Sequence, residues 1–444
     1  MFETIVASMN EMVELWKIND PSWVDSSSDR RCFIHREIHG RKFSNQVLPP
    51  QTSTGRIELS KDCGIVSMTM DFELEQVKWM NLFPTIVTKA KTIEVLDSVL
   101  GEMYEKLHIL SPLVGAREFF FIRGCRQLDA TTWILVDISY DIFNDIQSGV
   151  PSYSWKFPSG CAIKDMGNGQ SKVTWVEHVQ VYEKYQVNHI FRDLLCDREA
   201  YGAKRWIVIL QRMCERINFQ MGSTYPNRHD SKGVFHDPEE IKNTIQVSQR
   251  MVKKFFEILS MTDNHGDFSI SPQLNRGDRI SIVKNEETIQ PKGFIAIWDI
   301  LTGGNNVIEL DRVLTGTFPG NNITIIQEML VLEETSIDEM GASLVYAPID
   351  LRATNSIVNG GDATKVPILP SGIIISPDGR LSSNRDNTAN AQNGSILTVT
   401  FQIVICGNNN PTSRQQKMEV VGSVHTVLSA TILRIKETLG SSNL

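Results

Sequence analysis

The sequence predicts an α+β protein in which a curved antiparallel sheet is closed by a long helix, followed by a second α+β domain of similar order. An amphipathic helix over Arg198–Arg216 places Trp206, Leu210 and Met213 on one apolar stripe. Strand-like segments precede this helix, and Asn168-Gly169 between two of them indicates a tight hairpin because both turn positions need positive φ. The order of opening helix, strands and closing helix then recurs, which predicts two versions of one architecture.

The first domain is expected over residues 1–222. Apolar residues from Ile5 to Trp16 recur at helical spacing and predict its opening helix. The polar stretch Asp25–Gly55 predicts a loop. The remaining elements are a strand at Ile65–Met70, a crossing helix at Phe72–Phe83, and strands at Ile86–Leu96, Met103–Leu110, Glu118–Cys125, Thr132–Tyr140, Gly160–Met166 and Lys172–Val181.

A polar linker is expected over residues 223–240, and the second domain over 241–444. Apolar residues from Ile245 to Leu259 predict its opening helix, and those of Val420–Leu439 predict its closing helix. Strands are expected between them at Arg279–Val283, Val307–Leu314, Ile323–Leu332, Ser343–Ile349, Pro367–Ile375 and Ser395–Ile405.

Composition excludes several classes of protein. A formal net charge of -8 on 444 residues argues against direct DNA binding, which depends on clustered Lys and Arg. The seven cysteines are scattered without a C-x-x-C pair, so we expect buried, reduced thiols rather than disulfides or a zinc site. The N-terminus lacks the basic region of a signal peptide, and no apolar run approaches the roughly 18 residues of a transmembrane helix. We therefore expect a soluble intracellular protein.

Catalytic motifs are missing from the sequence. There is no Gly-x-Ser-x-Gly elbow, P-loop or His-Glu-x-x-His motif. His178 follows Glu177 on a predicted strand, and neighbours in a strand point to opposite faces, so this pair supports a hydrolase or cyclase only weakly. We expect no catalytic residue, no metal ligand and no cofactor.

Arg123 raises an open question. Phe119, Phe121 and Arg123 share one face of a predicted strand. If that face is interior, the guanidinium needs a carboxylate, ordered water or the polar head of a guest molecule, because an unpaired buried charge is costly. The alternative is an exposed arginine. On the closing helix, Lys204 and Arg205 are expected on the solvated polar side.

Long motifs distributed over the chain resemble a known family. The START domain of plant class IV homeodomain-leucine zipper (HD-Zip IV) proteins is similar to the segments Ser111–Phe119, Pro158–Cys161, Ser171–His178, Tyr201–Trp206 and Cys214–Arg216. The START-adjacent region of that family resembles Trp298–Leu301, Tyr346–Asp350, Asn359–Asp362 and Leu369–Gly372. The resemblance implies a helix-grip fold, in which the sheet and the closing helix enclose an apolar tunnel for a sterol or phospholipid.

The resemblance also implies roles for single residues. Arg123 corresponds to the arginine that lines the START cavity, which favours its inward orientation. The position that matches its usual acidic partner holds Lys106, with Glu105 beside it. Two departures stand out: the homeodomain and zipper are absent, and Gly293–Ile297 runs directly into Trp298 where family members have an additional strand and helix. We expect an internal deletion near 293–298.

These observations predict a noncatalytic lipid- or sterol-binding regulatory module of an HD-Zip IV-type transcription regulator, whose occupancy tunes stability or partner binding. The expected location is the nucleus, with the cytoplasm as the alternative, and expected partners are a lipid and full-length family members. Alternatives are a protein-interaction scaffold whose cavity is filled by aromatics such as Phe120 and Trp133, or a truncated non-functional relative. The predicted ligand-lining residues are Phe119, Phe121, Arg123, Ile134, Val136, Ile138, Trp175, Trp206, Leu210 and Met213.

Overall fold

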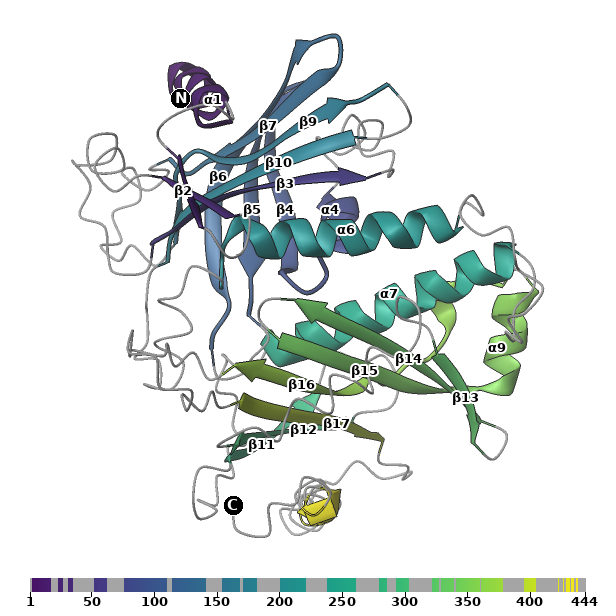
Figure 1. Cartoon of the computed structure of the whole chain (residues 1–444). Helices are drawn as coiled ribbons and strands as arrows, with labels where there is room; N and C mark the ends of the chain where they lie inside the picture. Colours follow the sequence, from purple (N-terminus) through teal and green to yellow (C-terminus); the bar gives the residue numbers. More distant parts are fainter. Residues whose placement is uncertain are drawn as a thin grey trace. The chain divides into compact units, whose positions relative to one another are not determined.

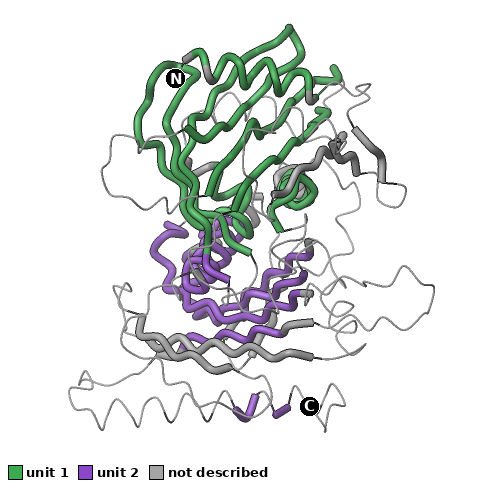
Figure 2. Tube along the Cα trace, turned by 90° about the vertical axis from the view of Figure 1, so that its left-hand side faces the viewer, with its two compact units in different colours: residues 1–109, 116–230, 338–340 green, residues 110–115, 231–337, 341–444 purple. Residues whose placement is uncertain are grey.

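The computed structural model of the chain contains two compact units, each built around its own sheet (Figures 1 and 2). Unit 1 comprises residues 1–109, 116–230 and 338–340, and unit 2 comprises residues 110–115, 231–337 and 341–444. The structure describes residues 2–16, 23–26, 31–34, 52–61, 76–109, 114–140, 154–167, 171–181, 200–220, 238–260, 279–285, 293–302, 322–326, 329–338, 341–359, 361–377, 395–404 and single positions between 422 and 437.

The sheet of unit 1 is antiparallel in every pairing between its strands. Its path runs in the order β1 (Trp23–Ser26), β2 (Arg31–Ile34), β3 (Thr52–Lys61), β10 (Ser171–Gln180), β9 (Ser159–Asp165), β7 (Thr132–Ile138), β6 (Arg117–Asp129), β5 (Leu100–Leu107) and β4 (Val87–Asp97). The short strand β8 (Trp155–Lys156) pairs with β10 beside this path. The six strands predicted between Ile86 and Val181 are confirmed.

Two local predictions in unit 1 have different outcomes. The β9–β10 pairing, with Asp165 opposite Ser171, confirms a hairpin at the predicted turn, although Asn168 and Gly169 themselves lie outside the described residues. The loop predicted over Asp25–Gly55 is wrong, because β1, β2 and the start of β3 fall within it. Backbone pairing of β3 along the whole of β10 stabilises a strand there despite its polar composition. The strand predicted at Ile65–Met70 also lies outside the described residues.

Helices cover both faces of this sheet (Figure 1). On one face lies α1 (Phe2–Trp16), whose Ile5, Met9 and Met12 pack against the apolar side chains of β6, β7 and β10. On the other lie α4 (Gln76–Leu82) and α6 (Ala203–Gln220), the latter passing across β3 and β10. The closing helix thus exists but begins at Ala203, after a turn, rather than at Arg198. This is the predicted helix-grip arrangement.

Unit 2 repeats the combination of an opening helix and an antiparallel sheet. Its helix α7 (Pro238–Ser260) was predicted, and Phe255 of α7 lies close to Gly372 in the sheet. The strand order is β11 (Arg279–Asn285), β12 (Gly293–Thr302), β17 (Ser395–Val404), β16 (Ser371–Pro377), β15 (Gly341–Asp350), β14 (Met329–Asp338) and β13 (Asn322–Ile326). The described positions between Gly422 and Glu437 are helical, as predicted for the closing helix.

Several details of unit 2 differ from the prediction. The single strand expected over Ile323–Leu332 is wrong, because β13 and β14 form an antiparallel hairpin there. Residues 293–302 form the uninterrupted strand β12, so Trp298–Leu301 is extended and pairs with β17. Helix α9 (Leu351–Val358) and the short 3-10 helix η4 (Ala363–Lys365) were not predicted. The strand expected over Val307–Leu314 lies outside the described residues.

Candidate functional site

The two faces of the unit 1 sheet differ in chemistry although they are built by the same strands. Toward α1 the sheet presents an apolar cluster that includes Ile122, Ile134, Val136 and Val176, with Ile138 packed at its margin. We call the opposite side, covered by α4 and α6, the α6 face. Because side chains alternate along a strand, the neighbours of these apolar residues, among them Arg123, occupy the α6 face.

The sequence prediction therefore assigned one strand to the wrong face. Ile134, Val136 and Ile138 were expected to line the same interior as Arg123, but they pack against α1. The residue opposite Arg123 in the β6–β7 register is Asp137, which shares its face. The physical reason is that a second helix covers the far side of the sheet, so a completely apolar row is also required there.

Arg123 belongs to a buried ionic cluster of four side chains that we call the quartet. Its Nε and Nη2 donate to the two carboxylate oxygens of Asp137 at 2.7 and 2.8 Å, and Nη2 also lies 3.0 Å from Oε1 of Glu105. The Nζ of Lys156 lies 3.2 Å from Oε2 of Glu105 and 3.2 Å from Oδ2 of Asp137. All four side chains are at most 4% exposed, so each charge is compensated inside the protein.

The quartet keeps its members charged. Burial by itself lowers the pKa of Arg123 and of Lys156, but the neighbouring carboxylates outweigh it and raise both pKa values. Burial likewise raises the pKa of Asp137, but Arg123 and Lys156 outweigh it and lower that pKa. The bidentate Arg123–Asp137 contact also fixes the orientation of the guanidinium.

The acidic partner of Arg123 is now defined. The sequence placed Lys106 at the matching position, and the structure shows that Glu105 makes the ion pair while Lys106 lies opposite Glu118 in the β5–β6 register. Asp137 and Lys156 were missed. A lone acid in the apolar strand β7 was a usable signal for Asp137, whereas Lys156 sits in a two-residue strand that has no periodicity.

Aromatic rings surround the quartet. The Cζ of Arg123 lies 4.2 Å from the ring centroid of Trp79 on α4, and the Nζ of Lys156 lies 4.4 Å from that of Phe121. Trp175 of β10 stacks on Trp206 of α6 with centroids 5.1 Å apart and an interplanar angle of 12°. Cations over aromatic faces are stabilised by the ring quadrupole. The structure thus brings together the predicted residues Phe119, Phe121, Arg123, Trp175 and Trp206, with Leu210 and Met213 buried on α6.

Arg123 and Glu177 each have a buried polar atom without a hydrogen-bond partner among the described residues. One is Nη1 of Arg123 and the other is Oε1 of Glu177. The other oxygen of Glu177 accepts a bond from Nε1 of Trp175 at 3.0 Å. Burial raises the pKa of Glu177 to about 7, an effect that Lys156 partly offsets. Glu177 therefore changes its charge near neutral pH.

Glu177 and His178 do not form a catalytic pair. Glu177 shares the α6 face with Trp175, whereas the ring of His178 lies 4.4 Å from that of Phe157. Consecutive strand residues point in opposite directions, so His178 is not placed to exchange a proton with Glu177. Among the residues that the structure describes, no group of three His, Cys, Asp or Glu side chains is placed to hold a metal ion.

Arg205 was predicted on the solvated side of the closing helix, and this is wrong. The side chain is 1% exposed. Its Nη1 donates to the carbonyls of His108 at 2.9 Å and Ala200 at 3.2 Å, and Nη2 donates to the carbonyl of Thr85. The carbonyls of Thr85 and His108 lie just before β4 and just after β5, and they accept hydrogen bonds from the guanidinium. These bonds connect the start of α6 to the sheet.

Two further properties concern the described helices and cysteines. None of the described helices is both long enough and apolar enough to cross a membrane. Cys125, Cys161 and Cys214 are buried free thiols, as predicted for the cysteines.

Comparison with known proteins covers both units. The START domain matches residues 4–216, and the PDF2-like C-terminal domain matches residues 296–441. Homeobox-leucine zipper protein HDG8 of Arabidopsis thaliana is 35% identical over an alignment of 497 positions, gaps included. The alignment covers 98% of this chain and 69% of that protein. Homeobox-leucine zipper protein ROC8 of Oryza sativa subsp. japonica is 33% identical over an alignment of 508 positions, which covers 100% of this chain and 71% of that protein. The chain thus spans about two thirds of the length of these relatives.

Among solved structures, human StAR-related lipid transfer protein 5 is similar with a TM-score of 0.35 and 12% sequence identity, covering 49% of this chain and 97% of that one. The quartet, Glu177 and the aromatic rings around them all fall within the segment that matches the START domain.

Proposed function

The chain belongs to the HD-Zip IV family of homeobox-leucine zipper proteins, and we propose that its START domain binds a lipid or sterol without catalysing a reaction. Occupancy then tunes the stability or partner binding of a transcription regulator. A ligand that binds only the folded state stabilises it by RT ln(1 + [L]/Kd), about 2.7 kcal/mol at a hundredfold excess over Kd. A change of this size is enough to alter the amount of folded protein.

The observation that carries this proposal is the pair of unsatisfied buried atoms on the α6 face. Buried polar groups nearly always have a partner, so Nη1 of Arg123 and Oε1 of Glu177 are suited to the polar head of a guest. Apolar side chains on the adjoining helix, such as Leu210 and Met213, are suited to its hydrocarbon body. The proposed lining residues are Phe119, Phe121, Arg123, Trp175, Trp206, Leu210 and Met213.

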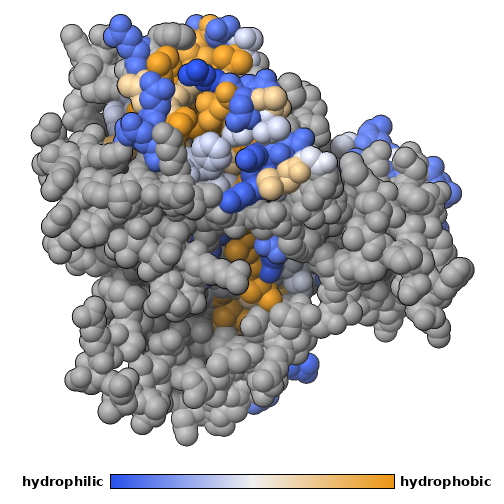
Figure 3. Space-filling view, turned by 45° about the horizontal axis from the view of Figure 1, so that its top comes forward, coloured by the Kyte–Doolittle hydropathy of each residue, from blue (hydrophilic) through white to orange (hydrophobic). Residues whose placement is uncertain are grey.

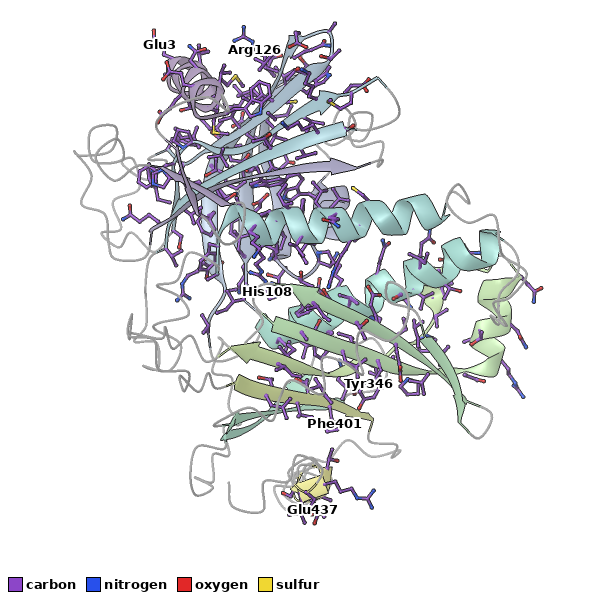
Figure 4. All side chains as sticks on the ribbon, viewed as in Figure 1. Glu3, His108, Arg126, Tyr346, Phe401 and Glu437 are labelled. Carbon is purple, nitrogen blue, oxygen red and sulfur yellow. The ribbon has the colours of Figure 1, made fainter. Side chains whose placement is uncertain are left out.

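The experiment is native mass spectrometry of the full chain after mild purification. We expect a co-purified lipid mass in the wild type and a much smaller one in Arg123→Leu. Because that variant leaves two buried carboxylates poorly compensated, Arg123→Lys serves as a second variant that keeps the charge but removes the guanidinium donors. The matched control is Arg126→Leu, an exposed arginine on the same strand that points away from the sheet (Figure 4).

The outcomes separate clearly. Reduced lipid in both Arg123 variants, with full occupancy in Arg126→Leu, supports the proposal. Wild-type lipid content in folded Arg123→Lys and Arg123→Leu contradicts the role of Arg123.

A second candidate function is a protein-interaction scaffold with a filled interior, and two observations favour it. Trp79, Phe83 and Trp206 contact one another, with centroids 4.8 to 6.1 Å apart, so aromatics occupy part of the space beneath α6. Edge strand β4 has exposed apolar side chains, among them Val95, which is 54% exposed. On the surface of unit 1, apolar residues lie among hydrophilic ones (Figure 3). Phe120, however, contacts Tyr104 on the other face and does not fill this interior. A clean ligand-free mass with undiminished partner binding favours the scaffold.

Further parts of the proposal concern the whole chain. We infer a START module over residues 1–222, a linker over 223–240 and a START-adjacent module over 241–444 with an internal deletion near 293–298. The alignment with the HDG8 protein spans 497 positions although the chain has 444 residues, which supports segments missing from this chain, and β12 runs without interruption through 293–298. The proposed location is the nucleus, the proposed protein partners are full-length family members, and the net charge of -8 disfavours direct DNA binding.

A further inference from the structure

We propose that Glu177, held in place by Trp175, makes the site select a lipid with an uncharged, hydroxyl-bearing head over one with an anionic head. This rests on the proposed function and adds the chemical class of the ligand. Three observations on the α6 face lead to it: the balance of buried charge, the fixed position of one carboxylate oxygen, and the unsatisfied state of the other.

The first observation is that both cations of the quartet are already paired with carboxylates. The charged and titratable groups of the described residues on this side are Arg123 and Arg117 from β6, Lys156 from β8, Glu105 from β5, Asp137 from β7, Cys161 from β9, Glu177 itself from β10 and Arg205 from α6. The guanidinium of Arg205 donates to backbone carbonyls, and α4 contributes the uncharged ring of Trp79. Both cations already contact both Glu105 and Asp137. A phosphate head can accept from Nη1 of Arg123, but it brings a further negative charge close to Glu105, Asp137 and Glu177, which is unfavourable in a buried site.

The second observation is that Glu177 is oriented. Its Oε2 accepts from Nε1 of Trp175 at 3.0 Å, and the Trp175 ring is stacked on Trp206 of α6. The carboxyl group is 2% exposed and cannot turn toward solvent without breaking this bond. Oε1 is consequently the oxygen presented to the interior, where it has no partner among the described residues.

The third observation is that Oε1 is unsatisfied, and a neutral hydroxyl and an anionic phosphate offer it different groups. A hydroxyl group can donate to an ionised carboxylate and can accept from a protonated one, so it bonds to Glu177 in either state. An ionised phosphodiester carries no proton and only accepts, so it bonds only to the protonated acid and is repelled by the carboxylate. The hydroxyl oxygen also offers lone pairs to a donor such as Nη1 of Arg123.

The test loads the full chain from phosphatidylcholine vesicles that carry either dioleoylglycerol or dioleoyl phosphatidylmethanol, with sitosterol vesicles in parallel. The first two lipids share their acyl chains, and phosphatidylmethanol is a phosphodiester whose single negative charge does not change between pH 6 and pH 8. Lipid recovered with the re-isolated protein is quantified by mass spectrometry at pH 6 and pH 8. We expect wild type to load a hydroxyl lipid, sitosterol or dioleoylglycerol, at both pH values. Its loading of phosphatidylmethanol should fall about tenfold from pH 6 to pH 8, because a carboxyl of pKa about 7 goes from mostly protonated to mostly ionised over that interval.

Glu177→Gln separates the electrostatic role from the shape of the site. The amide retains an acceptor for Trp175 and a polar group for the ligand but cannot ionise. We expect it to load phosphatidylmethanol equally at the two pH values. The control is Glu94→Gln, an exposed carboxylate on edge strand β4, which should behave as wild type.

Failure of this inference is distinguishable from failure of the proposed function. If wild type loads phosphatidylmethanol as well as hydroxyl lipids at pH 8, or if Glu177→Gln leaves the pH dependence intact, selection by Glu177 is overturned while lipid binding stands. If wild type recovers none of the three lipids, the proposed function itself is contradicted.

Discussion

The two faces of the unit 1 sheet are built by the same strands yet stabilised differently. Ile122, Val136 and Val176 fill an apolar cluster beneath α1, while their immediate neighbours Arg123, Asp137 and Glu177 lie on the α6 face. The α1 face holds only side chains whose burial is favourable in itself. On the α6 face, burial of charges is tolerated because of their mutual contacts. A face that served only as a core would not need the second arrangement, so the contrast points to a function on the α6 side.

Removing Arg123 from the α6 face should have the largest effect on stability. Arg123→Leu leaves Glu105 and Asp137 buried with Lys156 as the remaining cation, and we expect the free energy of unfolding to fall by about 3 to 5 kcal/mol. Denaturant unfolding followed by tryptophan fluorescence measures this in unit 1, because every tryptophan except Trp298 belongs to that unit. The exposed Arg126→Leu should change stability by less than about 0.5 kcal/mol. A loss equally small in Arg123→Leu would show that the quartet does not depend on its arginine.

The pH dependence of stability should distinguish Glu177 from its neighbours. Its pKa is raised to about 7 by burial, so between its ordinary pKa and 7 the folded state holds a proton that the unfolded state releases. Stability therefore falls as pH rises through this window and levels off above pH 7. From pH 5.5 to pH 8 this one group should lower the free energy of unfolding by about 2 kcal/mol.

Urea unfolding at several pH values, compared with Glu177→Gln, checks this contribution. The free energy of unfolding of wild type, relative to that of Glu177→Gln, should fall by that amount between pH 5.5 and pH 8. Parallel curves for wild type and variant would mean that Glu177 keeps an ordinary pKa.

The smallest effect is expected on the α1 face, from Gly124→Ala. A Cβ at Gly124 would lie 2.4 Å from Cε of Met9 and 3.3 Å from Cγ1 of Ile5. The methionine tip can move aside, so we expect a loss of about 1 kcal/mol from overpacking. Lipid content should stay unchanged, because α1 lies on the opposite side from the proposed site. Loss of lipid in a stable Gly124→Ala protein would contradict the separation of the two faces.

The same contrast between the two faces explains which site residues the sequence could predict. Alternation was enough to predict β6, β7 and β10 and to group Phe119, Phe121 and Arg123 on one face. It could not show which side of β7 points toward α6, because the apolar row of Ile134 and Val136 suits a core under α1 as well as a cavity under α6.

The residues that the sequence missed depend on tertiary contacts. Lys156 meets Glu105, which is 51 positions away in the chain, and Arg205 meets the carbonyl of Thr85, which is 120 positions away. Neither contact leaves a local pattern, so only the folded arrangement identifies these partners.

Photocrosslinking with a sterol or diacylglycerol that carries a diazirine, followed by peptide mapping, tests most directly whether the guest occupies the α6 face. The account predicts adducts on β6 around Phe119 and Phe121 and on α6 between Trp206 and Met213, all suppressed by excess unlabelled lipid. Competed adducts confined to α1 and the apolar cluster beneath it, or no competed adducts at all, would contradict it.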